Sequence, residues 1–264
     1  MFVYPNPDPI AFQIGPVKVH WYGIMYLVGF LSAWWLARRR ASSPRSTWTP
    51  IEVDDLIFYC SVGVILGGRL GWCLFYGTEQ TIANPLTIFR IWDGGMSFHG
   101  GLVGVLVALA LLARHRGRRV ADVFDFTAPL PAVGFGAVRI GNFINGELWG
   151  KPTDVPWAFV VNGRPLHASQ LYEATLEGLV LFVILWWFTS TPRPRWAPSG
   201  LFLVCYGLFR FLIEFVRVPD ANRGYLLFGW VTMGQILSTP MILAGLAMLV
   251  IAYRRREPSG NDKA

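Results

Sequence analysis

The chain has 264 residues, of which 53% are hydrophobic and only 15% are charged. An ordinary soluble domain carries about 25% charged residues, so this composition argues against a soluble enzyme. The formal net charge of +7 would raise the question of nucleic acid in a soluble domain. Here most of the basic residues lie in short segments between apolar stretches, so we expect a polytopic membrane protein that contacts the lipid bilayer and no nucleic acid.

Seven apolar stretches follow one another along the chain, each long enough to cross a bilayer at about 20 residues per helix. We expect an all-α membrane protein, a polytopic bundle of seven transmembrane helices that forms one domain over 1–264. The predicted spans are about 21–37, 56–76, 97–113, 124–144, 169–189, 200–216 and 230–252. The first twenty residues lack a basic segment followed by an apolar run, so no cleavable signal peptide is expected.

The orientation follows from the positions of Lys and Arg, because positively charged flanks are retained in the cytoplasm. They gather in alternate connecting segments, at 38–45, 114–119, 193–195 and 254–263. The opposite segments, one of which holds Arg223, carry fewer. This alternation predicts an external N-terminus and a cytoplasmic C-terminus.

Three arginines lie inside predicted spans: Arg69, Arg139 and Arg210. An arginine at the bilayer centre costs about 2.5–3.5 kcal/mol on insertion scales, so it persists where it faces protein, water or an anionic partner. Each of them could also extend toward a nearby interface or pair within the bundle. For Arg69 we favour a structural role that ties helices together.

A polar stripe runs along the sixth span. Tyr206, Arg210, Glu214 and Arg217 follow at intervals of four, four and three residues, which places them within an arc of roughly 80° on one helix face. Ion pairs within the helix would explain the two arginines and the glutamate structurally. The stripe is nevertheless net positive in an apolar medium, which favours binding of an external anion.

The end of the fourth span is also polar, in the string VRIGNFINGELWG. Arg139 and Asn142 lie one turn apart, Gly146 continues that face, and Glu147 follows near the outer surface. Lipid cannot satisfy the Asn142 amide, so this side chain should point into the protein.

Two further residues lie on the predicted external side. His99 lies at the start of the third span beside Gly100 and Gly101, which leave room for a substrate near a side chain suited to proton transfer. A hydrogen-bonded structural histidine is the alternative. Tyr22 opens the first span in the string HWYGIMY, where an interfacial anchor is the more common role.

The sequence contains no GxSxG elbow, no HExxH motif and no carboxylate cluster suited to Mg²⁺ or Zn²⁺. Cys60, Cys73 and Cys205 lie in apolar stretches, as expected of small buried residues. We therefore expect chemistry without a metal, a cofactor or a serine nucleophile. The planar fork of arginine suits bidentate binding of phosphate or carboxylate.

Together these motifs resemble the bacterial prolipoprotein diacylglyceryl transferases. The matching strings, in family order, are HWYGIMYLVGF, LGGRLGWCLFY, WDGGMSFHGGLVG, VRIGNFINGELWG, HASQLYE, YGLFRFLIEFVRVPD and MGQILSTPM. The resemblance implies an enzyme of the bacterial inner membrane, with its active site toward the outer leaflet. It would move the diacylglyceryl group of phosphatidylglycerol onto the lipobox cysteine thiol of a preprolipoprotein signal peptide, releasing glycerol 1-phosphate.

The resemblance also implies residue roles. The family's essential histidine falls on His99, its phospholipid-binding arginine on Arg139, and its other essential arginine and tyrosine on Arg210 and Tyr206. Further functionally important positions fall on Tyr22, Asn142, Gly146, Glu147, Glu214 and Arg217. Our hypothesis is that His99 takes the thiol proton, directly or through water or Tyr206, while Arg139 and Arg210 hold the phosphate. The external segment 148–168 is shorter than in some relatives.

Two other classes remain open at this point. Intramembrane Arg, Glu and His also line the pathways of anion transporters and channels. Transporters often contain inverted repeats, and the two halves of this chain show no self-similarity. A seven-helix receptor is harder to reconcile with three arginines inside spans and no obvious signalling loops.

Overall fold

A computed structural model describes residues 1–219, 224–226 and 228–262, so Arg223 and Lys263 of the predicted topology lie outside the described residues. The chain forms two compact units. Unit 1 comprises Met1–Leu36 and Asp125–Ser259, and unit 2 comprises Ala37–Phe124 and Gly260–Ala264. The single domain expected over 1–264 stays a prediction.

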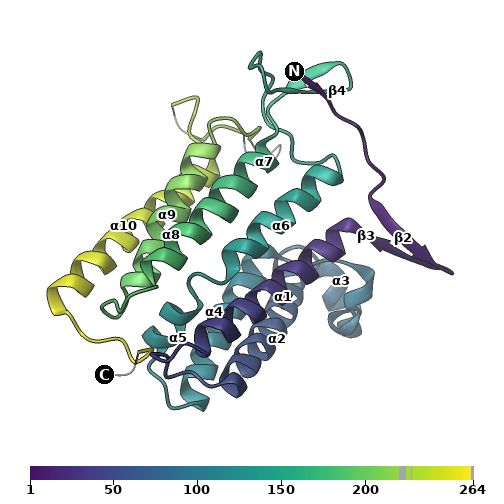
Figure 1. Ribbon diagram of the computed structural model, residues 1–264. Coiled ribbons are helices and arrows are strands. Elements are labelled where there is room, and N and C mark those ends of the chain that lie inside the picture. Colours follow the sequence, from purple (N-terminus) through teal and green to yellow (C-terminus); the bar gives the residue numbers. More distant parts are fainter. Residues whose placement is uncertain (220–223, 227, 263–264) are drawn as a thin grey trace. The chain divides into compact units, whose positions relative to one another are not determined.

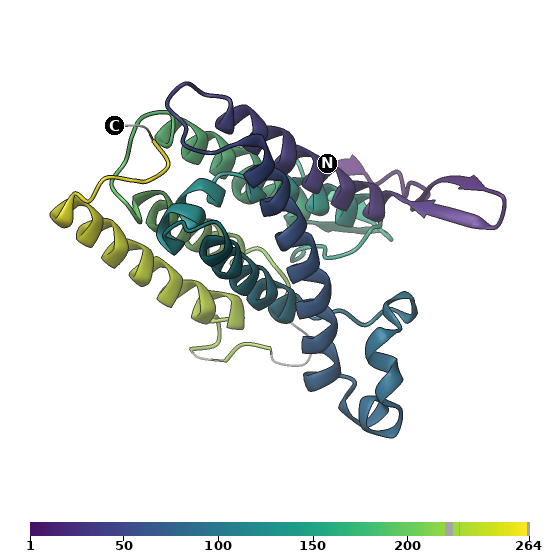
Figure 2. The same cartoon turned by 90° about the horizontal axis from the view of Figure 1, so that it is seen from below.

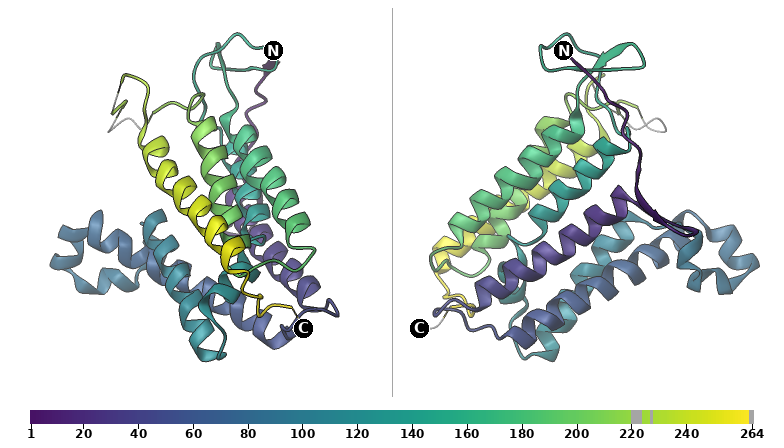
Figure 3. Two further views of the ribbon diagram at one scale, coloured as in Figure 1. Left: turned by 90° about the vertical axis from the view of Figure 1, so that its left-hand side faces the viewer. Right: turned by 45° about the vertical axis from the view of Figure 1, so that its right-hand side comes forward.

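Unit 1 contains most of the helices, and Figures 1 and 3 show α6, α8, α9 and α10 side by side. Two helices, α1 and α5, cross the boundary between the units. The helices are α1 (Trp21–Ala41), α5 (Val120–Thr127), α6 (Pro131–Ile144), α7 (Ser169–Glu173), the π-helix η3 (Ala174–Val180), α8 (Leu181–Phe188), α9 (Ala197–Ile213) and α10 (Met233–Arg255).

Unit 2 is built on the pair α2 (Pro50–Phe75) and α4 (Phe98–His115). Glycines let these helices approach closely, since a Cβ added to Gly71 would lie 2.7 Å from Cα of Gly100. The segment of the chain that connects α2 to α4 contains α3 (Thr78–Ala83) and the 3-10 helices η1 (Pro85–Phe89) and η2 (Ile91–Asp93). Figure 2 shows this connecting segment projecting beyond the end of α2.

The helices agree with an all-α membrane protein. Among the described residues, α2, α4, the run Ser169–Phe188 and α10 are long and apolar enough to cross a membrane. The stretch predicted as one span at 124–144 is broken, because α5 and α6 meet at an angle of 46°. Pro129 and Pro131 explain the break, since proline lacks the backbone N–H that a continuous helix requires. The bent pair, counted as one span, would make five.

The structure also contains short β-strands, which the expectation of an all-α protein did not include. β2 (Ile10–Ile14) and β3 (Val17–His20) form an antiparallel hairpin before α1. β1 (Phe2–Val3) pairs in parallel with β4 (Phe159–Val161), which pairs with β5 (Arg164–Leu166). The segment 148–168 therefore forms a small sheet with the N-terminus of the chain. This segment is too short and too polar to be predicted as a transmembrane helix.

The core of unit 1 lies where α6, α8 and α9 meet. Ala132, Leu181 and Leu185 are fully buried and pack against rings that include Phe135 and Tyr206. The buried Asp125 carboxylate accepts hydrogen bonds from the Trp196 and Ser199 backbone N–H groups at 2.6 and 3.0 Å. These donors belong to the start of α9, so Asp125 satisfies backbone groups that the helix itself leaves unpaired.

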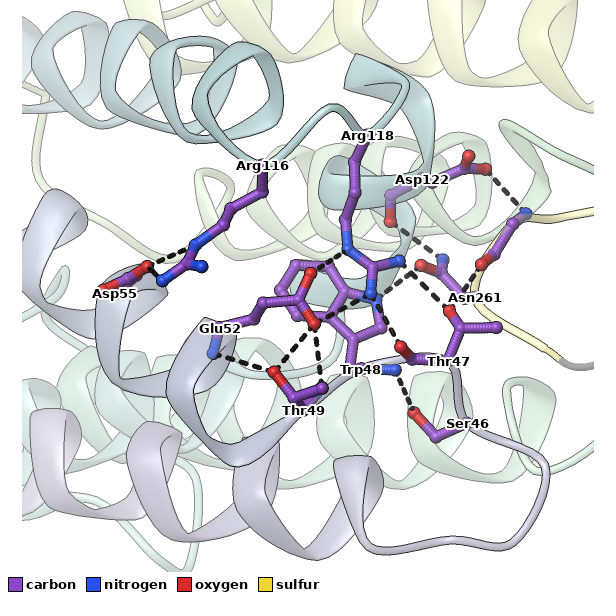
Figure 4. A network of polar contacts seen from close by, with 11 residues as sticks. Ser46, Thr47, Trp48, Thr49, Glu52, Asp55, Arg116, Arg118, Asp122 and Asn261 are labelled. Atoms are coloured by element: carbon purple, nitrogen blue, oxygen red, sulfur yellow. Dashed lines mark hydrogen bonds and ion pairs between the residues drawn. The ribbon is translucent and has the colours of Figure 1, made fainter.

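A polar network fixes the C-terminal tail within unit 2 (Figure 4). Asn261 accepts a hydrogen bond from Trp48 Nε1 at 2.7 Å and donates to the backbone oxygen of Asp122 at 2.8 Å. Arg118 lies over the Trp48 ring at 4.4 Å and its Nε is 2.6 Å from Glu52 Oε1. The tail thus bridges the loop before α2 and the start of α5.

Candidate active site

The close approach of α6 and η3 positions the first arginine of the site. Gly136 and Gly178 face each other so closely that a Cβ on Gly178 would lie 2.6 Å from Cα of Gly136. Arg139 follows Gly136 by about one helical turn, and Glu173 and Glu177 precede Gly178. The two glycines therefore bring the Arg139 guanidinium beside two carboxylates, that of Glu173 directly before the π-helix and that of Glu177 within it. Single-turn π segments are frequent at functional sites.

Glu173 is the centre of the site, with a side chain that is 0% exposed. Its Oε2 lies 2.5 Å from Arg139 Nε. Its Oε1 accepts a hydrogen bond from Arg210 Nη1 at 3.1 Å and another from Arg217 Nη1. One carboxylate thus joins Arg139 of α6 to Arg210 and Arg217 of the polar stripe, and the sequence analysis assigns Glu173 no role.

The predicted ion pairs of the polar stripe are confirmed. Arg210 Nη2 lies 2.5 Å from Glu214 Oε1, and Arg217 Nε lies 3.2 Å from the same oxygen. The stripe is not wholly helical, however, because α9 ends at Ile213 and Arg217 forms a β-bridge with Gly150.

The expectation of a net positive stripe needs correction. Glu173 and Glu177 lie 3.1 and 4.0 Å from Arg210 Nη1, so the three arginines of the cluster face three carboxylates. Residue spacing describes the charges on one helix only. The acids that compensate the arginines of the stripe, Glu173 and Glu177, come from α7 and η3. The exposed edge of the cluster is still cationic, because the Arg139 and Arg210 side chains are 24% and 20% exposed and the carboxylates 0–5%.

Asn142 and Glu147 extend the site at the end of α6. Asn142 is 4% exposed, as predicted for an inward-facing amide, and its Oδ1 accepts a hydrogen bond from Arg139 Nη1 at 3.4 Å. Its Nδ2 donates to Glu147 Oε1 at 2.8 Å. Gly146 has a φ of +69°, a conformation that glycine adopts without strain, and this turn returns Glu147 toward Asn142.

Tyr4 completes the end of α6, a contact that sequence reasoning did not find. Its hydroxyl donates to the backbone oxygens of Phe143 and Ile144, which lie at 2.8 and 3.0 Å. Burial raises the pKa of this phenol, so the hydroxyl remains a hydrogen-bond donor. The only signal in the sequence was an aromatic residue near the N-terminus, far from the helix it stabilises.

Both predicted tyrosines contact α6, and the Tyr206 ring lies 5.5 Å from the Phe135 ring between centroids. The Tyr22 ring packs against Gly141, where a Cβ would lie 3.3 Å away, and its hydroxyl is 3.3 Å from that of Tyr26. Tyr206 stacks on Phe202 with ring centroids 5.8 Å apart, and its electrostatic neighbours include Glu177 and Arg210. Both tyrosines therefore border the arginine and glutamate cluster.

His99 belongs to unit 2. It is the second residue of α4, whose first turn is capped by the hydroxyl of Ser97 accepting from Gly100 N–H at 3.2 Å. The side chain is exposed and lies beside the Phe98 ring. The structure thus confirms the predicted place of His99 at a helix start, directly before Gly100 and Gly101.

The chain matches over residues 9–251 the family model described as prolipoprotein diacylglyceryl transferase. It is 58% identical over 258 residues to the phosphatidylglycerol–prolipoprotein diacylglyceryl transferase of Pseudomonas aeruginosa (strain LESB58), covering 97% of each chain. The proteins of the same name from Oleidesulfovibrio alaskensis and Coxiella burnetii (strain RSA 331 / Henzerling II) are each 57% identical over 260 residues, which is 97% of this chain and 97% and 100% of theirs. By its sequence along nearly its whole length, the chain belongs to the prolipoprotein diacylglyceryl transferase family.

Proposed function

We infer that the protein transfers the diacylglyceryl group of phosphatidylglycerol to the lipobox cysteine thiol of preprolipoproteins, the first step of lipoprotein maturation. Its family and the names of its relatives support this reaction. The observation in the structure that carries it is the buried Glu173, which holds Arg139 and Arg210 with part of each side chain exposed. Such a cationic edge matches the phosphate of an anionic lipid.

The arrangement of the arginines favours the departure of phosphate. In the transfer, a carbon–sulfur bond forms as the bond between the same glycerol carbon and the phosphate oxygen breaks. The electron pair of that bond leaves with glycerol 1-phosphate, so negative charge grows on the phosphate. Guanidinium groups held in place before the reaction stabilise this developing charge more than the starting lipid, which lowers the barrier.

The nucleophile belongs to the substrate. The lipobox cysteine supplies the thiol, so the protein needs no reactive cysteine of its own. The thiol must lose its proton because the thiolate is the attacking form. We assign proton removal to His99, directly or through water or Tyr206, and phosphate binding to Arg139 and Arg210. Asn142, Gly146, Glu147, Tyr22, Glu214 and Arg217 complete the proposed lipid site.

We also propose the finer topology that the sequence predicts. The bundle would cross the bacterial inner membrane seven times, with the N-terminus outside and the C-terminus in the cytoplasm. In that arrangement α1, α9 and the bent pair of α5 and α6 supply the three spans beyond the four helices that are long and apolar enough by themselves, and the active site opens toward the outer leaflet.

The test is a transfer assay with purified protein, phosphatidylglycerol and a lipobox peptide. We expect Arg139→Ala to raise KM for the lipid and lower kcat, and His99→Gln chiefly to lower kcat. Arg164→Lys changes an exposed arginine of β5 and serves as the control. Near-normal turnover by both Arg139→Lys and His99→Gln would overturn the site assignment, and anion flux in liposomes without glycerol 1-phosphate release would overturn the reaction.

A further inference from the structure

Arg69 lies in α2 with 4% of its surface exposed, outside the proposed lipid site. Its guanidinium donates hydrogen bonds to four backbone oxygens. Nε donates to Ile88 at 3.2 Å, Nη2 to Thr87, and Nη1 to Gly95 at 3.1 Å and also to Gly94. The guanidinium carbon lies 4.8 Å from the centre of the Trp72 ring.

These contacts explain how the buried charge is accommodated. Thr87 and Ile88 lie near the end of η1, where backbone oxygens carry partial negative charge. The planar fork of arginine presents several N–H groups in fixed directions, so one side chain reaches oxygens on both sides of it. Arg69 therefore connects α2 to two separate parts of the segment that leads into α4.

The second of those parts is a turn with an unusual backbone. Gly94 and Gly95 have φ values of +79° and +77°, which favour glycine. A Cβ on Gly95 would lie 2.6 Å from the Trp72 ring, so the backbone passes directly over that indole. Arg69 and Trp72 thus hold the turn from two sides.

The turn leads directly to His99. The backbone N–H of Ser97 donates to the Gly68 oxygen at 2.8 Å, next to Arg69 in the chain, and the Ser97 hydroxyl caps α4. His99 follows two residues later, in the first turn of the helix. The direction in which α4 begins, and hence the direction of the His99 side chain, depends on where this turn is held.

We propose that Arg69 is a positioning residue that orients His99 by holding the turn Gly94–Ser97 against α2. The inference rests on the proposed role of His99 in the reaction. Arg69 contacts the peptide backbone and acts on the reaction through His99, so it affects the rate of the chemical step and leaves the affinity for phosphatidylglycerol unchanged. This role goes beyond the packing of the two helices, which also meet at Gly63 and Gly104, because the guanidinium binds the backbone of the turn itself.

A double-mutant cycle tests the proposal in the detergent-solubilised full chain, with Arg69→Lys, His99→Gln and the double variant. Lysine keeps the charge and has a single nitrogen, so it cannot replace the fork. We expect Arg69→Lys to lower kcat at least about tenfold with KM unchanged, and the double variant to be no slower than His99→Gln, because residues that act as one unit are not additive.

The outcomes separate the two claims. Losses that multiply in the double variant, or a raised KM for phosphatidylglycerol in Arg69→Lys, would overturn the positioning role and leave the proposed reaction intact. Normal turnover by His99→Gln would overturn the role of His99 and, with it, the role of Arg69.

A second pair of variants covers the case in which Arg69→Lys does not fold. Gly95→Ala disturbs the same turn, whereas Gly117→Ala places a methyl group in open space at a similarly positive φ of +64°. We expect Gly95→Ala to lower kcat with KM unchanged and Gly117→Ala to leave kcat near that of the unmodified chain. Equal kcat values for the two alanine variants would contradict the proposal.

Discussion

The buried carboxylate of Glu173 offers the sharpest test of how the site is held together. Glu173→Gln keeps the shape of the side chain but removes the charge that faces Arg139, Arg210 and Arg217. Removing one partner of a buried ion pair costs about 3–5 kcal/mol, because the remaining charges stay uncompensated. The amide oxygen can still accept a hydrogen bond, which offsets about 1 kcal/mol. We therefore expect the free energy of unfolding to fall by about 2–4 kcal/mol.

Glu177→Gln is the matched control for this prediction. Glu177 is equally buried, at 1% exposed, but its Oε1 lies 4.0 Å from Arg210 Nη1 and has no hydrogen-bond partner among the described residues. Neutralising a buried charge with such weak compensation costs little. We expect the control to change the free energy of unfolding much less than Glu173→Gln does.

The assay is unfolding of the detergent-solubilised protein, followed by circular dichroism as a denaturing detergent is titrated, together with the transfer assay. Glu173→Gln should also lower kcat/KM, because Arg139 and Arg210 lose the group that fixes their direction. The same free energy of unfolding for the two variants would refute the assignment of Glu173 as the centre of the cluster.

Three other predictions follow from the packing and protonation of the chain. Gly178→Ala should lower the thermal stability and activity of the protein, because its Cβ would lie 2.6 Å from Cα of Gly136, whereas Gly23→Ala, with open space around it, should not. Asn261→Ala should lower the free energy of unfolding by about 1–3 kcal/mol, since buried partners lose their hydrogen bonds; unchanged resistance to denaturant would contradict this. Burial lowers the pKa of His167, so the unfolded chain binds its proton first as the pH falls below about 6.5. Stability should decrease on acidification through that range, and the difference in Tm between pH 7 and pH 5 should be smaller in His167→Gln.

The sequence alone determined the local features of the protein. Apolar length predicted helical segments, and the long helices begin and end near the predicted bounds, apart from 124–144, which is broken into α5 and α6. Residue spacing predicted the pairing of Arg210 with Glu214 and of Glu214 with Arg217, because both pairs are local in the chain. The inward direction of Asn142 followed from the cost of an unsatisfied amide in lipid.

Only the tertiary structure decided which helices share their charges. The sequence pattern of α9 described a net positive stripe, since periodicity reports on one helix at a time. The close contact of Gly136 with Gly178 brings Glu173 and its neighbours against that stripe. Likewise, the oxygens that receive Arg69 are backbone atoms, and no residue type in the sequence marks them. A buried charge can be read from the sequence, but its partner is fixed by packing between segments far apart in the chain.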